Sequence, residues 1–103
     1  MVQTEIINIL KNYLNLVKAE GVSVDKAYLY GSYLNNAQTE ESDIDLMVVT
    51  RNLCDDNTIG KIWSLTRTVN SKIEPYIIDK NRFENDNASP LVDLVRKKGL
   101  KIL

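Results

Sequence analysis

Residues 26–50 read KAYLYGSYLNNAQTEESDIDLMVVT, and this stretch decides the fold class. Its last seven residues, Ile44–Thr50, are almost continuously apolar, which is typical of a strand buried on both faces of an α/β sheet. Its first five residues, 26–30, form a shorter strand that stops at Gly31. The polar connection between them, residues 33–42, predicts a short helix and loop.

Two carboxylates, Asp43 and Asp45, stand at the head of the apolar strand, where ionised side chains are uncommon. Side chains two residues apart in a strand point to the same face, so the two acids face the same way. Adjacent carboxylates repel each other, and a divalent cation between them makes the arrangement favourable. Oxygen ligands without histidine or thiolate indicate Mg²⁺, with Mn²⁺ as the alternative.

A Gly-Ser step, Gly31-Ser32, stands before the first of these acids, and ten residues lie between Ser32 and Asp43. Gly31 allows a sharp turn and the close approach of a ligand to the backbone. Ser32 offers a hydroxyl and a backbone N–H, and a helix beginning here would favour a phosphate at its N-terminus. A lone Gly-Ser usually marks a turn and a lone Asp-x-Asp is common. The two motifs together at neighbouring strand ends are considerably more specific.

Helices and strands alternate along the rest of the chain. Apolar stripes predict one helix over residues 4–20 and another over residues 58–70, with Trp63 in the core. Residues 52–57 and 81–87 are polar and predict loops.

A third strand is expected over residues 73–78, and a helix runs from Ser89-Pro90 to Gly99. Residues 100–103 are expected to add an edge strand. This order predicts a single α/β (α+β) domain over residues 1–103, with a small mixed sheet and helices packed on it.

Topology adds a third carboxylate to the two aspartates. The short connection between the first two strands favours an antiparallel pair, whereas the helical connection to the third favours a parallel one. Glu74, early in the third strand, then lies at the same end as Asp43 and Asp45. The alternative for Glu74 is a surface acid beside Lys72. Asp79 competes for the third position, but it is expected at the wrong end and on the opposite face.

Composition excludes several classes of protein. The chain contains no histidine, which rules out Ser-His-Asp and Cys-His catalysis and histidine-ligated zinc. A formal net charge of −1 gives no reason to expect nucleic-acid or membrane binding. A lone cysteine, Cys54, and the lack of a signal-peptide pattern or of an apolar run of about 20 residues predict a soluble cytoplasmic protein.

The pattern Gly31-Ser32, ten residues, Asp43-x-Asp45 resembles the signature of the DNA polymerase β-like nucleotidyltransferase superfamily. The short length is similar to its minimal nucleotidyltransferase (MNT) branch, which often forms the antitoxin of HEPN/MNT toxin–antitoxin pairs. The closing run SPLVDLVRKKGLKIL also resembles the last helix and tail of that branch. The resemblance implies a polymerase β-like fold in which Gly31 and Ser32 bind the triphosphate.

The resemblance also implies the metal site and the reaction. Asp43, Asp45 and Glu74 would hold two Mg²⁺ ions; many relatives have Asp at the third position, and Glu also occurs. The reaction implied is transfer of a nucleoside monophosphate, AMP from ATP, to a tyrosine hydroxyl of a HEPN ribonuclease toxin. Two alternatives stay open. One is a non-catalytic antitoxin that neutralises its partner by occlusion, and the other is a small-molecule nucleotidyltransferase acting within a homodimer.

Overall fold

The computed structural model describes residues 4–34, 39 and 42–103. The elements follow in the order α1 (Thr4–Ala19), β1 (Val24–Tyr30), β2 (Ile44–Thr50), α2 (Asp56–Ser64), α3 (Thr66–Val69), β3 (Ile73–Asp79), α4 (Lys80–Asn85), α5 (Pro90–Lys98) and β4 (Leu100–Lys101). Most of the connection predicted as a short helix and loop, residues 33–42, lies outside the described residues. None of the helices in the described ranges is long and apolar enough to cross a membrane.

The sheet has the strand order β3-β2-β1-β4. β1 pairs antiparallel with β2, β2 pairs parallel with β3, and the short β4 pairs antiparallel with β1. The predicted pairings and the predicted C-terminal edge strand are therefore confirmed. Within the described part of the chain, β3 is the outer strand on the side away from β4, and it contains Pro75.

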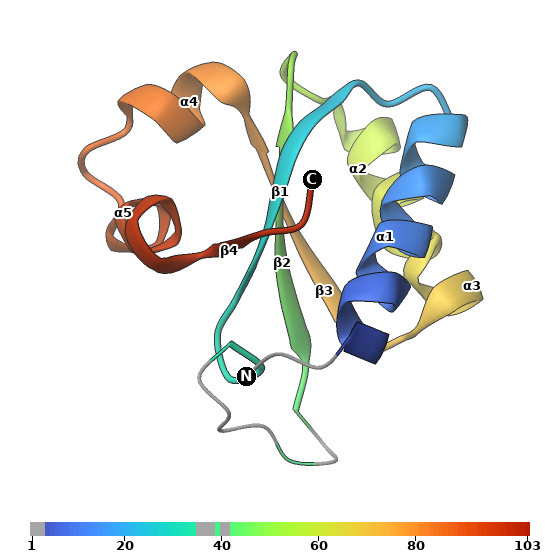
Figure 1. Ribbon diagram of the computed structural model, residues 1–103. Helices are drawn as coiled ribbons and strands as arrows, with labels where there is room; N and C mark the ends of the chain where they lie inside the picture. Colours follow the sequence, from blue (N-terminus) through green and yellow to red (C-terminus); the bar gives the residue numbers. More distant parts are fainter. Residues whose placement is uncertain (1–3, 35–38, 40–41) are drawn as a thin grey trace.

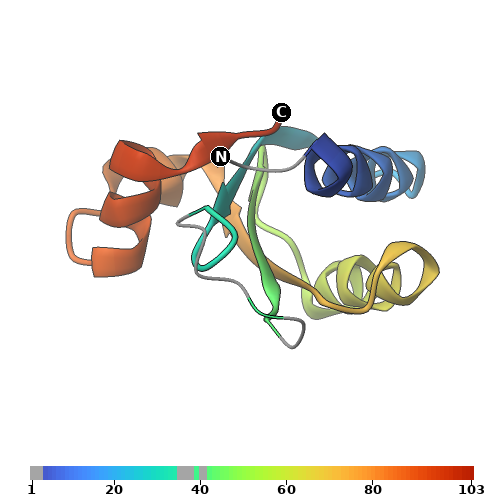
Figure 2. The ribbon, with the colours of Figure 1, turned by 60° about the horizontal axis from the view of Figure 1, so that its bottom comes forward.

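Helices cover both faces of the sheet (Figure 1). α1, α2 and α3 lie against one face, and α4 and α5 lie against the other, as the turned view also shows (Figure 2). The predicted fold class, a small mixed sheet with helices packed on it, is confirmed.

The larger core lies between the sheet and α1–α3. Strands and helices contribute apolar side chains that are almost fully buried, among them Leu10, Tyr13, Leu14, Val17, Leu29, Leu46, Val48, Ile62 and Ile73. The Tyr13 hydroxyl donates a hydrogen bond to the carbonyl of Ile62, which joins α1 to α2. Burial raises the pKa of Tyr13 well above its usual value, so this hydroxyl stays a donor at any ordinary pH.

The smaller core lies between the sheet and α4 and α5. It consists of Met47, Val49, Ile78, Phe83, Val92 and Val95. The Phe83 ring stacks on Tyr28 of β1 with 5.3 Å between ring centroids. This core covers the face to which the odd-numbered residues of β2 point, which is also the face of Asp45.

The segment predicted as a loop over residues 81–87 instead begins with a helix, α4. Asp79 caps that helix by accepting a hydrogen bond from the backbone N–H of Arg82 at 3.1 Å. Phe83, 4% exposed, anchors it in the smaller core. The prediction was wrong because the polar composition of the segment hides one buried aromatic residue, and tertiary packing overrides weak local propensity.

The helix predicted over residues 58–70 is two helices that meet at Leu65. It also begins earlier, because Asp55 accepts a hydrogen bond from the Thr58 backbone N–H at 2.8 Å and caps α2. Trp63 is 44% exposed and not in the core, so that prediction was wrong. The neighbouring Ile62 takes the buried position, and one residue further along a helix the side chain turns by about 100°.

Candidate active site

One row of paired residues crosses three strands at one end of the sheet. Tyr30 of β1 pairs with Asp45 of β2, and Asp45 pairs with Glu74 of β3. Residues directly opposite each other on neighbouring strands point to the same face. The row therefore places two carboxylates and a phenol side by side on the face covered by α4 and α5. Asp43 lies two residues before Asp45, just ahead of β2.

The carboxylates of this row disfavour one another's ionisation. Burial raises the pKa of Asp45, and the negative charge of Asp43 raises it further. The pKa of Glu74 is raised by shielding of its carboxyl from water, by a hydrogen bond with the Asp43 side chain, and by the charges of Asp43 and Asp45. Glu74 as a whole is exposed, so the shielding is local. Three acids that oppose one another's charge form a site at which a cation is stabilising.

Gly31 is fixed by contact with one of these acids. Its φ is +83°, and a Cβ placed on it would lie 2.2 Å from the Asp45 Oδ2 atom. The backbone turns at once, since Leu34 donates its N–H to the Gly31 carbonyl at 3.1 Å. Only glycine satisfies both the left-handed backbone and the close approach. The Asp45 carboxylate is thus held against the backbone, while Ser32 is half-buried within the same turn.

The acids suit a hard divalent cation by their chemistry, since every donor is a carboxylate oxygen and Gly31 leaves room beside Asp45. In the residues that the structure describes, no three His, Cys, Asp or Glu side chains already surround a common point.

Tyr30 belongs to the same row, and sequence reasoning missed it. Its pKa is raised to about 12, chiefly by burial and then by Asp45, Tyr76 and Glu74. The phenol is therefore neutral at ordinary pH and lies beside the carboxylates. Its position immediately before Gly31, at the end of a strand antiparallel to β2, was the available signal.

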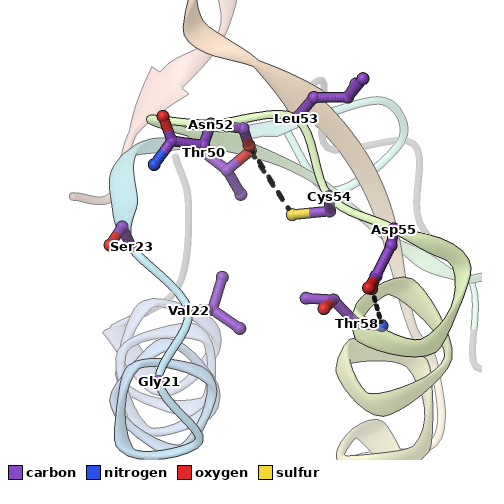
Figure 3. A pocket seen from close by; sticks show the side chains of 9 residues that line it. All are labelled: Gly21, Val22, Ser23, Thr50, Asn52, Leu53, Cys54, Asp55 and Thr58. Carbon is purple, nitrogen blue, oxygen red and sulfur yellow. Dashed lines mark hydrogen bonds between the residues drawn. The ribbon is translucent and has the colours of Figure 1, made fainter.

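A hollow of about 250 Å³ lies at the opposite end of the sheet, between the α1–β1 connection and the segment that joins β2 to α2 (Figure 3). Three of the polar side chains in its lining form hydrogen bonds within the protein. The Thr50 hydroxyl donates to the Asn52 carbonyl at 2.7 Å, the Cys54 thiol contacts Thr50 Oγ1 at 3.7 Å, and Asp55 caps α2. Asp79, the competing third acid, pairs with Thr50 in the register and so also lies at this far end.

Residues 4–99 match the family model described as polymerase beta, nucleotidyltransferase. The chain belongs to this family. The polymerase β-like resemblance of the sequence is thereby confirmed. No curated protein gives a significant match to this nucleotidyltransferase domain.

Several solved structures share the fold, with the low sequence identity expected of distant relatives. A toxin–antitoxin with AMP-PNP matches with a TM-score of 0.62 and 21% identity, over 89% of this chain and 71% of that chain. The toxin–antitoxin MntA–HpeT matches with a TM-score of 0.64 and 19% identity, over 90% and 71%. The tri-AMPylated HEPN toxin of Shewanella oneidensis in complex with its MNT antitoxin matches with a TM-score of 0.54 and 19% identity, over 92% and 71%.

Proposed function

We propose that this nucleotidyltransferase domain transfers AMP from ATP to a hydroxyl of a partner protein of the HEPN toxin type. The observation that carries the proposal is the row in which Asp45 and Glu74 are register partners, with Asp43 beside them and Gly31 against Asp45. Support for the partner comes from the structures that share the fold, one of which is a complex of a tri-AMPylated HEPN toxin with an MNT antitoxin. The domain would act in the cytoplasm.

In the proposed reaction the acceptor oxygen forms a bond to the α-phosphorus of ATP. The bond from that phosphorus to the oxygen bridging to the β-phosphate breaks, pyrophosphate leaves, and the acceptor proton passes to a carboxylate. Asp43, Asp45 and Glu74 would hold two Mg²⁺ ions, or Mn²⁺, which neutralise phosphate charge and lower the pKa of the acceptor hydroxyl. Gly31 and Ser32 would face the triphosphate.

Asp45 and Glu74 have different surroundings, and we assign them different tasks. Asp45 is half-buried and packed against Gly31, so its orientation is fixed and it suits the nucleotide side of the site. Glu74 is exposed on the outer strand, so an acceptor hydroxyl arriving from solvent reaches it directly.

Glu74→Gln is the test of this assignment. We expect label transfer from α-³²P-ATP to the co-purified partner to fall about 100-fold or more. MgATP affinity should change little, because the nucleotide side depends on Asp43 and Asp45. Label from γ-³²P-ATP should never appear on the partner, since pyrophosphate leaves.

Asp79→Asn is the matched control, because it removes a carboxylate from the same strand at the far end while asparagine still caps α4. Loss of transfer in Asp79→Asn but not in Glu74→Gln would contradict the assignment. A wild-type domain that binds and silences its partner without transferring label would instead indicate neutralisation by occlusion. Transfer to a small molecule and not to the partner would indicate the third alternative.

A further inference from the structure

A small hollow of about 140 Å³ adjoins the row of acids. It is lined by Tyr30, Gly31, Leu34, Leu94, Lys98 and Gly99. Two of these residues, Tyr30 and Gly31, also border Asp45. The hollow thus connects the acid row to the C-terminal end of α5, which lies on the same side of the sheet as the turn after β1 (Figure 2).

Lys98 is the one charged side chain among the described residues that line this hollow. Its neighbours in the last turn of α5 are already engaged, because Arg96 and Lys97 form ion pairs with Asp93 at 3.8 and 3.0 Å. Within the described part of the chain, Lys98 forms no ion pair or hydrogen bond of its own. The side chain is exposed, so its ammonium group is available to an anion that enters the hollow.

We propose that this hollow receives the β- and γ-phosphates of the bound nucleotide and that Lys98 contacts them. The inference rests on the proposed function, which puts the α-phosphate at the acid row. Directly beside the acid row, the hollow offers the Lys98 ammonium group and the Gly31 backbone turn to the rest of the triphosphate. Leu34 and Leu94 supply the apolar part of its lining.

The size of the hollow supports this assignment over a site for the whole nucleotide. Pockets that enclose a complete drug-sized ligand measure roughly 300–1,000 Å³, more than twice the 140 Å³ available. The hollow therefore accommodates part of the nucleotide, and the base lies outside it. The competing explanation for Lys98 is that it only complements the dipole at the C-terminus of α5.

Calorimetry with MgATP and with MgAMP separates a phosphate-binding Lys98 from one that only complements the helix dipole. The variants compared are Lys98→Met and Lys97→Met. We expect Lys98→Met to weaken MgATP binding about tenfold, the effect of losing one charged hydrogen bond, and to leave MgAMP binding within about twofold. Lys97→Met should match wild type with both nucleotides. Equal MgATP affinity in the two variants, or an equal loss with MgATP and MgAMP, would overturn the phosphate role of Lys98.

A second pair of variants tests the hollow without touching the lysine. Leu94 is 47% exposed and Leu53 is 80% exposed, so a glutamate is tolerated sterically at either position. Leu94→Glu puts a negative charge at the hollow and should weaken MgATP binding at least tenfold, whereas Leu53→Glu, at the far end of the sheet, should have no effect. Unchanged affinity in Leu94→Glu would overturn the inference while the proposed function stands. Failure of wild type to bind MgATP would overturn both.

Discussion

At the scale of single residues, Gly31 is required both by the backbone turn after β1 and by the close approach of the Asp45 carboxylate. Its positive φ and its contact with Asp45 Oδ2 both exclude a side chain. We expect Gly31→Ala to lower the free energy of unfolding by about 2 kcal/mol, since a left-handed conformation costs an L-residue about 1–2 kcal/mol and the displaced carboxylate adds to this. Urea denaturation measures the change in the free energy of unfolding. Calorimetry measures the weaker MgATP binding expected when the Asp45 carboxylate is displaced.

Gly60→Ala is the matched control for this substitution. Gly60 lies within α2, and a Cβ built there meets nothing within 4 Å. Alanine should therefore stabilise the protein by about 0.5–1 kcal/mol through helix propensity. If Gly31→Ala changes the free energy of unfolding as little as Gly60→Ala does, neither the turn nor the contact with Asp45 requires glycine at this position.

The positions of the three acids were predictable from the sequence, but their surroundings were not. Asp43 and Asp45 share a face because strands alternate with period two, and Glu74 joins them because a helical crossover makes two strands parallel. Tyr30 was missed, although it stands immediately before Gly31 at the end of a strand antiparallel to β2. The place of Lys98 depends on how the end of α5 packs beside the turn after β1, which no local pattern specifies.

At the scale of elements, the contrast between local sequence patterns and tertiary packing explains which helices and strands were predicted. A continuous apolar run predicts β2. Ser89 predicts the start of α5, and it caps that helix by accepting a hydrogen bond from the Val92 N–H at 3.3 Å. α4 has little helical propensity of its own and depends on the burial of Phe83. Sequence patterns thus identify elements that are stable by local rules, and they miss one that forms only on the assembled sheet.

Phe83→Ala tests this dependence of α4 on packing. Removal of a buried aromatic side chain costs about 3–5 kcal/mol, and here it also removes the ring stacked on Tyr28. Urea denaturation should show a loss in that range, together with a fall in helical circular dichroism as α4 detaches. Leu53→Ala, at an exposed position, should stay within about 0.5 kcal/mol of wild type. A loss below about 1 kcal/mol for Phe83→Ala would mean that α4 is held by other contacts.

At the scale of the whole molecule, the raised pKa values of Asp45 and Glu74 mean that their negative charges oppose folding. A ligand that binds only the folded state, at 100 times its dissociation constant, adds about 2.7 kcal/mol to stability. We expect MgATP to raise the melting temperature of wild type accordingly, and ATP with EDTA to have no such effect. The Asp43→Asn/Asp45→Asn double variant should lose the MgATP gain yet be at least as stable as wild type in EDTA. The same MgATP gain in that variant would place nucleotide binding elsewhere.

The outer strand β3 has a consequence for how any partner can approach the domain. An open sheet edge normally invites another strand to pair with it, and proteins block such edges with proline and charge. In a parallel pair, alternate residues bond to the neighbouring strand. The Ile44 N–H donates to the Lys72 carbonyl at 2.8 Å, so Pro75, three residues further, faces the open edge and removes a backbone donor there. Glu74, next to it, adds a charge. Lengthening of the sheet by a foreign strand, and edge-to-edge aggregation of copies, are both disfavoured there. A macromolecular acceptor of the proposed kind would therefore present its hydroxyl on a projecting side chain. It would not do so on a strand that pairs with the edge of β3.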